Sequence, residues 1–142
     1  MLLNNYRNLQ GAIFKDEYAN CIKRSGSVES MRIYNTVGNK NDTSIVIGTS
    51  DTPVDRSQYD LVEPVTENIV ESNKAMFTKN DTVDFKIFYR FTSVITNNSI
   101  NAITIREIGL LSKYKDVLLI REVVSPYVLE PGESVLISIS IE

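Results

Sequence analysis

The chain has 142 residues, a formal net charge of −3, a single cysteine and no histidine. This length fits about one domain, and the negative charge argues against nucleic-acid binding, which needs an excess of Lys and Arg on some face. The lack of histidine removes the commonest general base, the usual Ser and Cys nucleophile triads and most zinc sites. We therefore expect a protein that is not an enzyme and that holds no metal and no cofactor.

The sequence also bears on where the protein is made. No apolar stretch approaches the roughly 18 residues of a membrane span, and the N-terminus has no apolar core of a secretory signal. Cys21 has no partner for an internal disulfide, which fits synthesis in a reducing cytoplasm. Paired carboxylates such as Asp81 and Asp84 flank turns and strand starts, where Asp is common for structural reasons.

Residues 1–24 are apolar without the regular alternation of a strand, and Gly11 interrupts any helix. We expect an irregular or partly helical N-terminal arm that packs on a neighbouring protein. The candidate interaction residues are Leu2, Leu3, Tyr6, Leu9, Ile13, Phe14 and Tyr18.

The next segments are short strands separated by turns. Residues 27–34 alternate well enough for a strand, and the apolar run at 43–48 fits a strand that is covered on both faces. A loop follows at 48–53, and 59–64 is a short extended piece that ends at Pro64.

The second half has a clearer pattern. We expect strands at 82–96, 100–111, 117–124 and 134–141. Gly109 marks a bulge or a close approach of backbones, Pro126 ends the third of these strands, and Pro131 and Gly132 form the turn into the last. In that last strand Val135, Ile137, Ile139 and Ile141 share one face. The pattern predicts an all-β fold, an antiparallel β-sandwich or jelly roll, with residues 25–142 as a single domain.

One charged pair interrupts an apolar strand. Arg106 and Glu107 either face solvent or take part in a contact between subunits. With regular pairing, Ile103 and Ile105 share the face of Glu107, so we expect this carboxylate at the edge of the core. There it needs backbone N–H groups or a cation as partners, and we expect it to hold the loop from Gly48 to Pro64.

Three pieces of the sequence resemble small β-sandwich structural proteins of tailed bacteriophages. The first is Ile47-Gly-Thr-Ser-Asp-Thr-Pro-Val54 followed by Tyr59-Asp-Leu-Val-Glu-Pro64, which is similar to a "GTG-x-TP … L-x-x-P" loop. The second, Ile103-Thr-Ile-Arg-Glu-Ile-Gly-Leu-Leu111, is similar to an "I-x-E-[IV]-GL" strand. The third runs from Leu118 through "L-x-PG-x-S" at Leu129–Ser134 to the last strand. Ser50 stands where the pattern has a second glycine, so this loop is expected to differ in shape.

The resemblance covers roughly residues 45–142 and implies a non-enzymatic component of the virion, made in the cytoplasm of the host bacterium. Such a protein would be an assembly or attachment module on the capsid, neck or tail, such as a capsid decoration or the base of a fibre or spike. Its expected partners are other virion proteins and further copies of itself, with no nucleic acid and no membrane. The alternative is a carbohydrate- or receptor-binding module of a phage appendage, with exposed aromatic residues stacking on sugars.

Overall fold

The computed structural model describes residues 1–5, 19–31, 42–81, 86–113 and 115–141. These residues form the strands β1 (Ala19–Ile22), β2 (Val28–Met31), β3 (Thr43–Gly48), β4 (Pro64–Val65), β5 (Ile69–Asp81), β6 (Lys86–Asn97), β7 (Ile103–Ser112), β8 (Val117–Leu129) and β9 (Ser134–Ile141).

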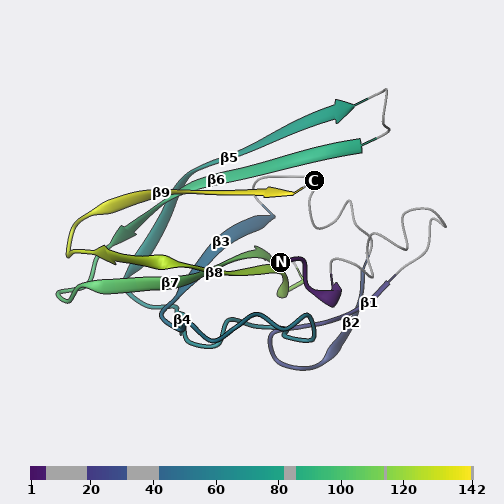
Figure 1. The fold of residues 1–142 in the computed structure, drawn as a ribbon, viewed down its shortest axis with the longest axis horizontal. Coiled ribbons are helices and arrows are strands. Elements are labelled where there is room, and N and C mark those ends of the chain that lie inside the picture. The colour runs from purple at the N-terminus through teal and green to yellow at the C-terminus, as the bar shows by residue number, and fades with distance from the viewer. Residues whose placement is uncertain (6–18, 32–41, 82–85, 114, 142) are drawn as a thin grey trace.

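The strands make two antiparallel sheets and one hairpin. The larger sheet has the order β4-β3-β7-β8, the smaller has the order β5-β6-β9, and β1 pairs with β2. Figure 1 shows the smaller sheet over the larger one, with the hairpin at one end of the molecule. The predicted all-β fold with antiparallel sheets packed as a sandwich is therefore confirmed.

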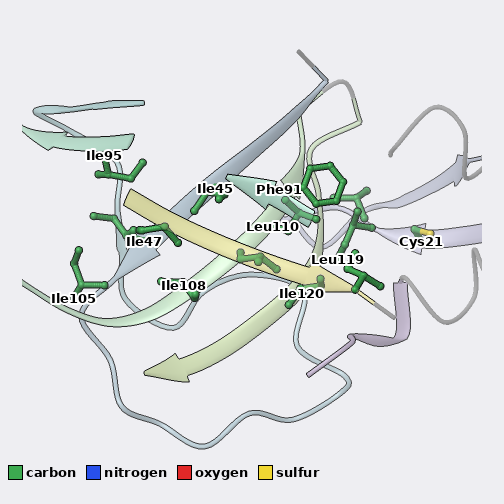
Figure 2. Packing of buried hydrophobic residues seen from close by; sticks show 14 of the residues in the cluster. Cys21, Ile45, Ile47, Phe91, Ile95, Ile105, Ile108, Leu110, Leu119 and Ile120 are labelled. Carbon is green, nitrogen blue, oxygen red and sulfur yellow. The ribbon is translucent and has the colours of Figure 1, made fainter. Parts of the chain in front are cut away.

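Apolar side chains from both sheets fill the space between them (Figure 2). Ile45 and Ile47 of β3 and Leu110 of β7 come from the larger sheet, and Phe91 and Ile95 of β6 come from the smaller one. Each such side chain stabilises the fold by about 1.5–3 kcal/mol when it is fully buried. This core is the main force that holds the two sheets together.

The last strand behaves as its alternation predicts. Ile137, Ile139 and Ile141 are buried, Val135 is half-buried, and the serines between them are exposed. Over its whole length β9 pairs with β6 without a register shift. The C-terminal strand is thus an integral part of the sandwich.

A second, smaller cluster lies on the outer face of the larger sheet. Leu3, Leu61 and Leu118 are buried there, with Val46 and Val54 packed against them. In β3, Val46 alternates with the core residues Ile45 and Ile47, so this cluster is on the side away from the smaller sheet. The connection between β3 and β4 crosses this face (Figure 1).

Several predicted strand limits were wrong. β5 was not predicted at all, and β7 begins at Ile103, because Ile100 lies in the preceding turn and is 91% exposed. β8 continues through Pro126 to Leu129. Proline is tolerated there because β8 is an edge strand and its pairing with β7 is irregular between Ile105 and Glu107. Residues 32–34 and 82–85 of the expected strands lie outside the described residues.

The beginning of the expected arm packs on its own domain. Leu2 forms an antiparallel bridge with Ile120 of β8, and Leu3 is fully buried. We predicted that Leu3 would contact a neighbouring protein, but in the structure it packs inside its own domain. At the other end of the arm, β1 is a strand of the hairpin. The remaining candidate contacts, Tyr6, Leu9, Ile13, Phe14 and Tyr18, lie outside the described residues.

Candidate functional site

A buried ion pair joins β7 to β8 on the outer face of the larger sheet. Nε of Arg121 donates to Oε2 of Glu107 at 2.7 Å, and both side chains are fully buried. Glu107 therefore neither faces solvent nor meets another subunit, the two alternatives for the Arg106–Glu107 pair. Its cation is Arg121 of the same chain, and Arg106 is half-exposed.

The carboxylate of Glu107 also accepts hydrogen bonds from the end of the β3–β4 connection. The backbone N–H of Glu63 donates to Oε1 at 2.8 Å, and that of Val62 donates to Oε2 at 3.2 Å. These are the backbone donors that the sequence led us to expect, and they lie in the expected loop. One detail was wrong, since Ile105 belongs to the core between the sheets and does not share the face of Glu107. The alternation in β7 changes phase because its pairing with β8 is irregular after Ile105.

Arg121 holds the beginning and middle of the same connection. Its Nη2 donates to the carbonyl oxygen of Thr52 at 2.9 Å, and its Nη1 donates to Oε1 of Gln58 at 3.1 Å. Together with Glu107, the guanidinium attaches the loop at three places. A buried ion pair needs such additional hydrogen bonds to offset the loss of hydration of both charges.

Because Gly48 has no side chain, it leaves room for the carboxylate of Glu107. It lies directly opposite Glu107 in the β3–β7 pairing, and a Cβ atom at Gly48 would lie 2.6 Å from the carbonyl oxygen of Glu63 and 2.7 Å from Cγ of Glu107. Gly109 has a similar role further along β7, where a Cβ atom would lie 2.9 Å from the carbonyl oxygen of Ile120. The predicted close approach at Gly109 is therefore present.

The loop held in this way presents a defined surface. Among its apolar and aromatic side chains, Tyr59 and Val62 are 42% and 43% exposed. Asp55 accepts hydrogen bonds from the backbone and hydroxyl of Ser57, which lower the pKa of its carboxyl. Burial raises the pKa of the Asp60 carboxyl. A connection of this length without strands or helices is uncommon in a compact domain, and an ordered one usually has a functional role.

The turn residues predicted to be structural lie at one end of the sandwich. Pro131 and Gly132 form the β8–β9 turn, and Gly132 has a φ of 79°, which glycine adopts without strain. The backbone N–H of Gly132 donates to the carbonyl oxygen of Asn97 at 2.7 Å. The buried amide of Asn97, which we did not predict, donates to the carbonyl oxygens of Asn101 and Leu129 and so links two turns.

A second polar cluster, also missed from the sequence, covers the edge of β3. β4 pairs only with Ile47 and Gly48, so on the side away from β7 no strand of the described residues lies beside the first part of β3. The backbone N–H of Ile45 donates to Oε2 of Glu71 at 2.5 Å, and Nζ of Lys74 donates to the carbonyl oxygen of Thr43 at 3.0 Å. The two side chains, which also form an ion pair at 2.8 Å, take the place of a neighbouring strand.

The arrangement offers little chemistry. Both carboxylates are fully engaged in ion pairs and hydrogen bonds, and within the described residues no group of three His, Cys, Asp or Glu side chains could hold a metal ion. No helix among those residues is long and apolar enough to cross a membrane. The network built on Glu107 and Arg121 holds the β3–β4 connection against the larger sheet.

Comparison with known proteins finds no matching family, no similar curated protein and no similar solved structure.

Proposed function

We propose that the chain is a non-enzymatic structural component of a tailed bacteriophage particle, an assembly module that attaches to the capsid, neck or tail. The observation that supports this most is a convergence in space. The first of the three segments that resemble phage structural proteins is about 45 positions from the other two, yet all three meet at the Glu107–Arg121 pair. Glu107 comes from the "I-x-E-[IV]-GL" strand, Val62 and Glu63 from the "L-x-x-P" piece, and Arg121 from the third segment.

A shared pattern is more informative when its residues form one physical unit. Here the unit is a loop of residues 49–63, held against a rigid sheet by buried charged hydrogen bonds. A loop that is ordered before binding loses less conformational entropy when a partner covers it, which favours tight attachment. Tyr59 and Val62 supply its exposed apolar area.

The test is the location of the protein in purified particles. We expect the chain in mass spectra of gradient-purified virions at a fixed number of copies per particle, and gold-labelled antibodies should mark one structure in electron micrographs. An abundant non-structural protein from the same infected cells is the control for carry-over. If the chain is depleted from virions as strongly as that control, the proposal is wrong.

The loop can be tested in the same assay. Tyr59→Ala and Val62→Ser should reduce incorporation into particles while leaving the free energy of unfolding nearly unchanged, because both side chains are exposed. Val128→Ser, at an exposed position on β8, is the matched control. Equal incorporation of all three variants would show that the attachment surface is elsewhere.

A further inference from the structure

The edges of the two sheets differ in how they are protected. An edge strand exposes unpaired N–H and C=O groups, which can pair with another chain unless charges, prolines, bulges or covering segments prevent it. On the β3 side, Glu71 and Lys74 satisfy the backbone of Ile45 and Thr43. The edge of β5 contains these same two charges and an irregularity between Ser72 and Ala75.

β8 is protected in a different way. The first residues of the chain lie along it, with the N–H of Leu3 donating to the carbonyl oxygen of Leu119 at 3.0 Å and Leu2 bridged to Ile120. Further along, Pro126 removes a donor at the irregular part of the strand.

Among the residues that the structure describes, none of these features protects the edge of β9. Residues 134–141 contain no charged residue, no proline and no glycine, and they pair with β6 in unbroken register. β9 is the last strand of its sheet, so within the described residues no strand lies on its other side. Long, regular and uncharged edge strands of this kind pair readily with another strand.

We infer that β9 is the site at which two copies of this chain associate, by antiparallel pairing of β9 with β9 of the second copy. The strand is suited to pairing with itself because each copy contributes the same alternation of serine outside and isoleucine inside. To keep serine on the outer face and isoleucine on the inner face in both copies, the register must place residues of the same face opposite each other. Serine or leucine then pairs with serine or leucine, and isoleucine pairs with isoleucine or valine. The two sheets β5-β6-β9 then become one continuous six-stranded sheet.

Two further observations favour a second copy as the partner. The whole chain carries a net charge of −3, but residues 134–141 carry none, so no like charges stand opposite each other between the paired β9 strands. Leu136 is 66% exposed on an otherwise serine-rich face of β9, and the neighbouring copy would cover part of it. A two-fold dimer is also the commonest symmetric arrangement of soluble proteins.

The first experiment compares two serine-to-lysine variants by sedimentation equilibrium. The native chain should approach a mass of about 32 kDa, twice the 16.0 kDa of one chain, at concentrations up to about 100 μM. Ser138→Lys places like charges near each other across the two-fold axis and should raise the Kd at least tenfold. Ser125→Lys makes the same change at an exposed position on the edge of β8 and should leave the Kd unchanged.

The second experiment separates charge repulsion from misfolding. Ser138 is exposed, so Ser138→Lys and Ser138→Glu should both melt cooperatively near the native temperature. Each variant alone should associate at least tenfold more weakly than the native chain, and a mixture of the two should form heterodimers that native mass spectrometry detects. A native chain that stays monomeric, a Ser125→Lys variant that weakens association as much as Ser138→Lys, or a mixture without heterodimers would each overturn the inference. None of these results would bear on whether the protein is part of a phage particle.

Discussion

Gly48 and Glu107 face each other across β3 and β7, and the side chain of Glu107 fills the space that a side chain at position 48 would need. Gly48→Ala should therefore lower the free energy of unfolding by about 3 kcal/mol, the upper part of the range for overpacked sites, because the backbone oxygen of Glu63 cannot move away easily. Urea denaturation measures this loss. The control is Gly132→Ala, where a Cβ meets no atom within 4 Å and only the positive φ is unfavourable, at about 1 kcal/mol. A loss for Gly48→Ala no larger than for Gly132→Ala would contradict the packing argument.

Removing the charge of Glu107 should be costly. Glu107→Gln leaves the buried guanidinium of Arg121 without its counter-ion, and the expected loss of stability is about 3–5 kcal/mol by thermal or urea unfolding. The double variant Glu107→Gln, Arg121→Met should lose less than the sum of the two single variants, since it leaves no unpaired buried charge. Glu122→Gln is the control, because the ion pair of Glu122 with the N-terminal amine is about half exposed and should contribute at most about 1 kcal/mol. Additive losses in the cycle would show that the pair is not coupled.

The carboxylate of Glu71 should protect a single backbone amide. In Glu71→Ala, the N–H of Ile45 loses its acceptor, so its hydrogen exchange should become faster, and the free energy of unfolding should fall by about 1.5–3 kcal/mol. Nuclear magnetic resonance of the amide protons reports both changes. Glu67→Ala, at an exposed position before β5, should alter neither. The edge argument fails if exchange at Ile45 is the same in both variants.

The single cysteine provides a pH prediction. Burial raises the pKa of the Cys21 thiol from 9.0 to about 11, so the folded chain keeps its proton where the unfolded chain loses it. This contribution to stability is complete below pH 9 and is lost as the pH rises toward 11. The stability of Cys21→Ala relative to the native chain should therefore improve between pH 9 and pH 11. In addition, iodoacetamide at pH 8 should label Cys21 at the rate of unfolding; rapid labelling of the folded chain would mean that the thiol is accessible.

The strands that could be predicted are those with an unbroken period of two, above all β9. β5 was missed because the irregularity between Ser72 and Ala75 and the positive φ of Asn73 break its alternation, and because Glu71 and Lys74 bond to β3 instead of facing solvent. The far end of β8 was missed because Pro126 ends a central strand but not an edge strand.

The candidate site was predictable in part. A carboxylate that points toward the core from an apolar strand needs buried partners. This requirement predicted that Glu107 binds the loop from Gly48 to Pro64. The partner Arg121 lies in another strand, and its contact with Glu107 depends on the pairing of β7 with β8, which local sequence does not reveal. Arg121 nevertheless interrupts an apolar run in the same way as Glu107, and two opposite charges in two buried strands are a signal that could have joined them.

The pairing of β3 with β7 has a consequence for synthesis on the ribosome. The nearest ends of these strands, Gly48 and Ile103, are separated by about 55 positions in the chain. The ribosome adds roughly 5–20 residues per second, so synthesis reaches β7 about 3–11 s after β3 is complete. Throughout that interval Ile45 and Ile47 are exposed in an uncharged β-forming segment, so we expect this strand to be the principal chaperone-binding segment of the nascent chain.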